Sequence, residues 1–252
     1  MKTLDFNLKR AYQLTLRHIL YSKGTLLIGT LAFAGFLLAV AMLTIMSPSL
    51  FHNYQLLVQK MSLPIIILVG CIISSTSFKE IHTFNKGNFY LTIPVSNLER
   101  LASVWFFSSV IYLVWTIAVL LIVNTIIGLM GNLMANISFE TVNLFSDEAF
   151  QFYKLYFVIQ TVFLFGSAYF KKNQFLKVFL SFFGLFLFLA LVTNLVAKIF
   201  FGDFSPYYFT QVAPELEQYA ETFKVVLKTA FWIFTAPFFL LLTFISLKEK
   251  QI

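Results

Sequence analysis

The chain has 252 residues, of which 59% are apolar and 12% are charged, and its mean hydropathy is +0.83. Soluble domains contain about 45–50% apolar and about 25% charged residues, so this composition excludes a soluble enzyme, a coiled coil and a disordered chain. A single cysteine, Cys71, excludes a disulfide framework and a cysteine-based zinc site. The net charge of +7 could indicate nucleic acid, but in so apolar a chain it fits basic residues at membrane ends, and we expect no nucleic-acid partner.

Long apolar segments dominate the chain. A helix needs about 20 mostly apolar residues to cross roughly 30 Å of hydrocarbon. Six segments meet this requirement: residues 25–45, 63–80, 101–130, 152–170, 175–196 and 226–247. The sequence therefore predicts an all-α, polytopic membrane protein in which residues 1–252 form a single transmembrane domain of six helices.

The charged residues between these segments and near their ends divide unequally between the two sides of the membrane. One side would carry 13 basic and 4 acidic residues, a net of +9, and the other 5 basic and 7 acidic residues, a net of −2. Cytoplasmic flanks of membrane proteins are enriched in lysine and arginine. We therefore expect both termini to be cytoplasmic and the chain to cross the plasma membrane, the inner membrane of a bacterium, several times.

An amphipathic helix is predicted over residues 4–22, before the first span. Its polar positions, Asn7, Arg10, Gln13 and Arg17, fall on one side of a helical wheel and its apolar positions on the other. Two interpretations remain open: an anchor lying on the inner leaflet, or an elbow that carries force into the first span. A cleavable signal peptide is not favoured, because the apolar run continues well past Ala34.

The spans lack the residues that membrane enzymes and ion-coupled carriers use. His18, His52 and His82 fall in the flanks, and no Asp or Glu lies in the middle of a span. Residues 24–30 have the glycine spacing of a phosphate loop, but Thr30 stands where the lysine is needed. We therefore expect no enzymatic activity, no catalytic residues, and no metal or cofactor site. Any energy from ATP would come from another chain.

Three amides lie deep within predicted spans: Asn124, Gln160 and Asn194. Polar side chains at such depth usually form hydrogen bonds between helices. The alternative, which also remains open, is that these three line a substrate path.

The connection between the second and third spans holds the most specific pattern. Ser96 and Glu99 form an S-x-x-E capping box that predicts a helix start after the extended backbone at Pro94. Aromatic and basic residues beside it suit docking on a partner protein, although the aromatics could instead lie in the lipid interface. The candidate partner-coupling residues are Lys79, Glu80, Lys86, Phe89, Tyr90, Pro94, Ser96, Glu99 and Arg100.

With these features the chain resembles the membrane subunit of ABC-2-type transporters. Many bacterial members carry an L-P-x-S-x-x-E segment at the start of the third span, and Pro94, Ser96 and Glu99 match it. Ile93 replaces the leucine before the proline, and the nearest basic residue after the glutamate is Arg100. The resemblance in topology covers nearly the whole chain, whereas the motif covers nine residues.

The resemblance implies a permease that moves substrate when a separate ATP-binding-cassette ATPase subunit hydrolyses ATP. Residues 79–100 would sit in a cleft of that ATPase, and a second permease, identical or not, would complete the path within the lipid. Residues 202–224 would be the outer connection between spans five and six. One alternative is a non-transporting anchor or regulatory subunit of a membrane complex. Another, a membrane enzyme acting on lipid, is disfavoured by the missing acid, base and metal ligands.

Overall fold

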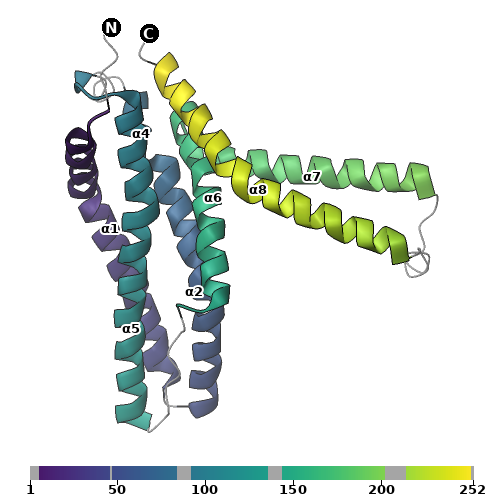
Figure 1. Ribbon diagram of the computed structural model, residues 1–252. Coiled ribbons are helices and arrows are strands. Elements are labelled where there is room, and N and C mark those ends of the chain that lie inside the picture. Colours follow the sequence, from purple (N-terminus) through teal and green to yellow (C-terminus); the bar gives the residue numbers. More distant parts are fainter. Residues whose placement is uncertain (1–5, 46, 84–91, 136–143, 202–213, 251–252) are drawn as a thin grey trace.

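The computed structural model describes residues 6–45, 47–83, 92–135, 144–201 and 214–250, and all regular structure in these ranges is helical (Figure 1). The elements in chain order are α1 (Leu8–Thr44), α2 (Pro48–Thr76), the 3₁₀ helix η1 (Lys79–His82), α4 (Asn97–Phe106), the π-helical segment η2 (Phe107–Ile111), α5 (Tyr112–Ala135), α6 (Asp147–Tyr169), α7 (Gln174–Phe201) and α8 (Pro214–Glu249).

Within the described residues, six helical stretches are long and apolar enough to cross a membrane, which confirms the predicted number and indicates a multi-pass membrane protein. Each overlaps one of the predicted segments. Their bounds are Leu26–Thr44, Lys60–His82, Asn97–Leu133, Asp147–Tyr169, Gln174–Val196 and Lys224–Glu249.

Two helices are longer than the sequence suggested. Asn7 caps α1, accepting a 2.9 Å hydrogen bond from the backbone N–H of Lys9, and the helix then runs without a break to Thr44. Its 37 residues correspond to about 55 Å, well beyond the roughly 30 Å of hydrocarbon. The amphipathic segment and the first span are therefore parts of one helix. Likewise, α8 begins at Pro214, a residue type favoured at helix starts, and continues into the sixth span.

The core is a bundle of α1, α2, α5 and α6 joined by buried tyrosines. The Tyr54 hydroxyl of α2 donates to Leu37 O of α1 at 2.7 Å, and the Tyr112 hydroxyl of α5 donates to Ile66 O of α2 at 2.8 Å. A hydroxyl in an apolar interior needs such a partner, because water is absent there. These bonds add directional links to an otherwise apolar core.

A π-helical segment interrupts the third span. The carbonyl of Ser108 in η2 accepts a hydrogen bond from the Tyr156 hydroxyl of α6. Gln160 lies one turn further along α6, and its amide, oriented so that both ends are satisfied, donates to the same carbonyl at 3.1 Å and accepts from Trp105 Nε1 at 3.2 Å. The widened turn thus directs its carbonyl toward two polar side chains of α6.

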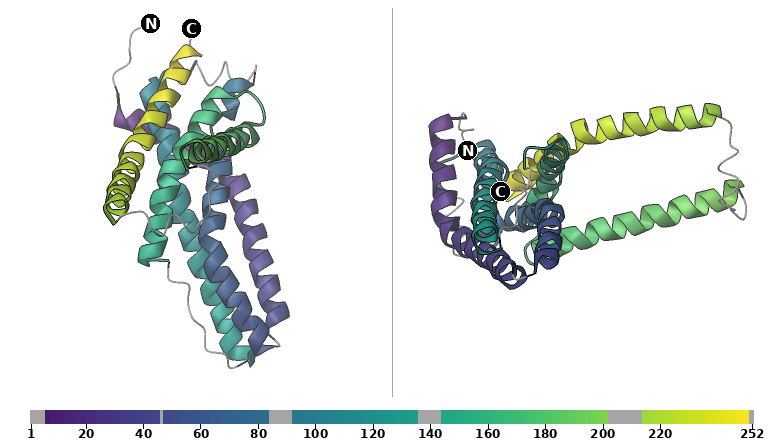
Figure 2. Two further views of the ribbon diagram at one scale, coloured as in Figure 1. Left: turned by 90° about the vertical axis from the view of Figure 1, so that its right-hand side faces the viewer. Right: turned by 90° about the horizontal axis from the view of Figure 1, so that it is seen from below.

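The remaining pair of helices leaves the bundle. Helix α7 and the first part of α8 extend sideways, while the last part of α8 returns along α6 and α4 (Figures 1 and 2). Beyond Val178, every described side chain of α7 except Ala190 is exposed. This arm is therefore an apolar surface that the rest of the chain does not cover.

Candidate functional site

The predicted capping box is present at the start of α4. The Ser96 side chain accepts from the backbone N–H of Glu99 at 3.2 Å, and Glu99 Oε2 accepts from the backbone N–H of Ser96 at 2.7 Å. These two bonds satisfy donors that every helix leaves unpaired at its N-terminus. The local prediction is confirmed, and it fixes where the third span begins.

The other oxygen of Glu99 binds the N-terminal helix. Glu99 Oε1 accepts from the backbone N–H of Asn7 at 2.7 Å, and from Arg10 Nε and Nη2 at 3.0 and 2.9 Å. The Glu99 carboxylate is fully buried, whereas the Arg10 side chain is 30% exposed. One carboxylate therefore joins the N-termini of α1 and α4, where a negative charge also suits the positive ends of both helix dipoles.

A second ion pair lies two turns further along α1. Arg17 Nη2 is 3.3 Å from Glu80 Oε2 in η1. Because Arg10 and Arg17 are seven residues apart, they lie on one face of the helix. That face thus binds both ends of the connection between the second and third spans, through Glu80 at its start and Glu99 at its end.

The start of the same connection is also fixed to the end of α6. The backbone N–H of Phe78 donates to Ser167 Oγ at 2.8 Å, and His82 Nε2 lies 2.9 Å from Ser167 O. Lys250 donates to the neighbouring carbonyl of Ala168, and Gln174 Nε2 donates to Ser167 O at 3.3 Å. Side chains from three other elements thus satisfy the last carbonyls of α6, which an isolated helix would leave unpaired.

Lys250 lies within reach of the charge of a second lysine, Lys171. Burial, and the charge of Lys171, lower the pKa of Lys250, and its ammonium lies 3.2 Å from His82 Nδ1. The negative end of the α6 dipole offsets part of this cost. The end of α8 is thereby tied to η1.

The predicted coupling residues take two different roles. Lys79 and Glu80 lie in η1 and Pro94 is exposed just before α4, so these three are near the surface. In contrast, Glu99 and Arg100 are buried, and Arg100 Nη2 donates to Ile93 O at 3.1 Å. These two support the connection from inside and do not offer a docking surface. Lys86, Phe89 and Tyr90 lie outside the described residues.

The three amides do not share one surface. Gln160 is fully buried in the hydrogen bonds given above, and Asn124 in α5 is 4% exposed. Asn194 is exposed on α7, where its Nδ2 donates to Ala190 O of its own helix at 2.8 Å. Gln160 therefore matches the interhelical interpretation. Asn124 and Asn194 lie on different elements, one inside the bundle and one on the arm.

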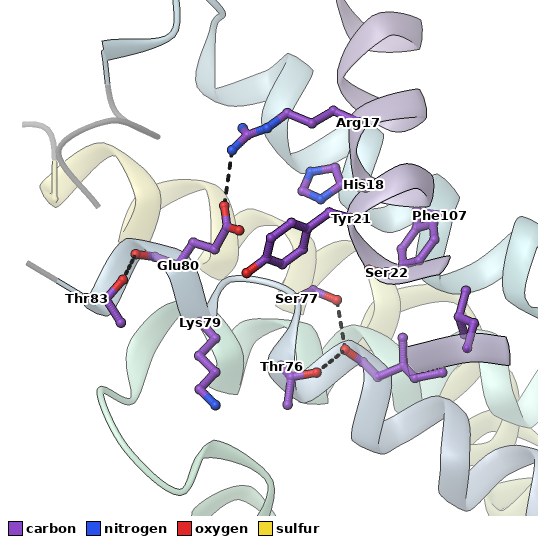
Figure 3. A pocket seen from close by; sticks show the side chains of 12 residues that line it. Arg17, His18, Tyr21, Ser22, Thr76, Ser77, Lys79, Glu80, Thr83 and Phe107 are labelled. Atoms are coloured by element: carbon purple, nitrogen blue, oxygen red, sulfur yellow. Dashed lines mark hydrogen bonds and ion pairs between the residues drawn. The ribbon is translucent and has the colours of Figure 1, made fainter. Parts of the chain in front are cut away.

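A cavity of about 420 Å³ lies beside the Arg17–Glu80 pair, between α1, the end of α2, and η1 (Figure 3). His18 lines it and its ring stacks on Phe107, with centroids 6.2 Å apart. Burial, with a smaller contribution from the charge of Arg17, lowers the pKa of His18 to about 4. The imidazole is therefore neutral at pH 7.

Sequence reasoning placed Arg10 and Arg17 on the polar face of the first helix but assigned that face no partner within the chain. The usable signal was their spacing of seven residues, together with one glutamate at each end of the connection. Ser167 and Lys250 gave no comparable signal.

No protein-family model matches the chain, and neither a curated protein nor a solved structure matches it. Among the described residues, no three His, Cys, Asp or Glu side chains gather as a metal ion would require.

Proposed function

We propose that the chain is the permease subunit of an ATP-driven ABC-2-type transporter, powered by a separate nucleotide-binding subunit and paired with a second permease. Two ion pairs, Arg17–Glu80 and Arg10–Glu99, are the main support for this proposal. They tie both ends of the connection after the second span to one face of α1. A segment that receives force from an ATPase needs stiff links of this kind to the helices that must move.

Three links leave this connection. Glu99 joins it to α1 and starts α4, Glu80 joins it to α1 a second time, and Phe78 with His82 joins it to the end of α6. A push on the connection would therefore reach helices on both sides of the bundle together.

The arrangement of the chain ends supports the orientation that the charges indicate. The start of α1, the start of α4 and the end of α8 lie at one end of the bundle (Figure 1). We place this end in the cytoplasm, at the inner face of the plasma membrane, where an ATPase would meet it. The exposed apolar arm of α7 and α8 supplies surface for lipid and for the second permease.

The test is a mild-detergent pull-down from the native membrane, followed by ATPase assays. We expect a nucleotide-binding chain to co-purify, and Phe89→Ala/Tyr90→Ala to lower the ATPase activity of the complex severalfold while the protein stays folded. The matched control is Phe145→Ala/Phe150→Ala, which removes two exposed aromatics before and within the first turn of α6. The control should keep wild-type coupling.

Either of two results would count against transport. If no nucleotide-binding chain co-purifies with folded protein, the permease has no energy source. If an ATPase binds but the aromatic variant leaves its activity unchanged, the chain is better described as a non-transporting anchor or regulatory subunit.

A further inference from the structure

The cavity beside the Arg17–Glu80 pair lies at the boundary between hydrocarbon and water. Leu26, the first residue of the first membrane-spanning stretch, lines it, and so do Thr76 and Ser77 from the last turns of the second. The helical segment before Leu26, the 3₁₀ helix η1, and the residues Ile73, Thr83 and Phe107 complete its wall. Its volume of about 420 Å³ is within the range of about 300–1,000 Å³ found for ligand sites.

The lining combines apolar and charged side chains. Leu26, Ile73 and Phe107 supply the apolar part. Arg17, Lys79 and Glu80 supply the charges, and Figure 3 shows Arg17 and Glu80 pointing toward each other. A cavity with both charged and apolar lining matches a molecule that has a charged part and an apolar part.

The charges select among such molecules. Two cations and one anion line the cavity, and the His18 imidazole adds no charge at pH 7, so the lining carries a net charge of +1. The hydroxyls of Tyr21 and Ser22 also line the cavity, and a hydroxyl is a donor for oxygen atoms. A phosphodiester with one negative charge would balance the lining, and an arginine is well shaped to bind it.

We propose that this cavity binds the glycerophosphate headgroup of an anionic phospholipid from the leaflet at the chain's basic end. The phosphate binds at the charged part of the cavity, which Arg17 and Lys79 line, and the first part of the acyl chains follows Leu26 and Ile73. The proposal depends on the membrane location of the six helices and does not require the transporter function.

Native mass spectrometry of the protein, released from bilayers of phosphatidylglycerol and phosphatidylethanolamine, tests the proposal by counting retained lipids. We expect wild type to retain phosphatidylglycerol selectively, and Arg17→Gln/Lys79→Gln to reduce this retention about tenfold, because hydrogen bonds to charged groups are lost. The matched control, Lys9→Gln/Lys23→Gln, removes two exposed cations from the same helix that do not line the cavity. It should retain phosphatidylglycerol as wild type does.

A second variant guards against a folding defect caused by leaving Glu80 without Arg17. Thr76→Trp keeps every charge and fills the cavity, and the Thr76 hydroxyl bonds only to carbonyls of its own helix, Ile72 O and Ile73 O. We expect the same loss of phosphatidylglycerol from this variant, with an unchanged melting temperature.

Equal retention of the two lipids by wild type would overturn the proposal, as would wild-type retention by both cavity variants. A competition experiment with soluble glycerophosphoglycerol completes the test. If it displaces the lipid at matched concentration, the site binds a soluble phosphodiester and the lipid assignment is wrong.

Discussion

At the scale of single residues, Glu99 concentrates more contacts than any position that the sequence singled out. Its carboxylate binds Ser96, Asn7 and Arg10 and has no exposure to solvent. The bond to Ser96 was predictable because both partners lie within four residues. The bond to Arg10 was not, since 89 residues separate the pair and the helical pattern says only that Arg10 is on a polar face.

Glu99→Gln tests how much this carboxylate contributes to the stability of the protein. Glutamine can still cap the helix, so the variant loses mainly the charge-assisted bonds to Arg10. We expect a loss of roughly 2 kcal/mol in stability, the size of hydrogen bonds to charged groups, measured as a fall in melting temperature in detergent.

The comparison variant is Glu80→Gln, which removes the more exposed pair with Arg17. It should cost less than about 1 kcal/mol, as exposed ion pairs do. Equal effects of the two variants would contradict the central role assigned to Glu99.

His18 gives a pH dependence with a definite sign. Its pKa falls from 6.5 to about 4 on folding, so the unfolded chain binds more protons than the folded chain between these values. Stability should therefore rise as pH increases from about 4 to 6.5, by up to about 3 kcal/mol for this residue. In His18→Phe, which can keep the stacking on Phe107, melting temperatures across this range should vary less steeply than in wild type. Parallel profiles would show that the imidazole does not titrate as described.

At the scale of elements, two helix crossings depend on glycine. A Cβ atom on Gly70 of α2 would lie 2.3 Å from the ring of Tyr156, and one on Gly166 of α6 would lie 1.9 Å from Val178 of α7. In contrast, a Cβ on Gly29, Gly35 or Gly184 would meet nothing within 4 Å. Glycine content alone does not separate these positions. Only the packing distinguishes the two groups, because the sequence does not say which helix faces which.

Gly70→Ala should destabilise the protein by about 1–3 kcal/mol, since Tyr156 is fully buried, bonded to Ser108, and cannot move aside cheaply. Gly35→Ala is the matched control. It should be neutral or stabilising, because alanine favours helix by up to about 1 kcal/mol. Thermal unfolding of both variants in the same detergent provides the comparison. A Gly70→Ala variant as stable as Gly35→Ala would contradict the packing of Tyr156 against α2.

At the scale of the whole molecule, the number of membrane-spanning helices was predictable because the apolar length of each segment depends only on local composition. The sideways arm of α7 and α8 was not predictable. Its sequence would be equally apolar whether its residues faced lipid, the bundle or a second chain. Helices that cross one bilayer tilt by at most about 40° from its normal, so the arm and the bundle can both cross only if the arm turns toward the bundle.

The proposed orientation can be tested by cysteine labelling in intact cells. After Cys71→Ser, single cysteines replace Lys23, Lys172, Lys60 or Lys224, all exposed positions. We expect a membrane-impermeable maleimide to label positions 60 and 224 before lysis, and positions 23 and 172 only after it. The reverse pattern would place both termini outside and remove the basis for an ATPase partner at that end.

The π-helical segment fixes the number of residues between α4 and α5, a property that does not depend on composition or charge. A π turn holds one residue more than an α turn would, and each residue in an α-helix turns the chain by about 100°. Losing one residue from Phe107–Ile111 would let the helix run on without interruption. It would also rotate α5 against α4, so that Glu99 could no longer face α1 while Tyr112 faces α2. Among true relatives of this chain, this stretch should therefore tolerate single-residue gaps hardly at all.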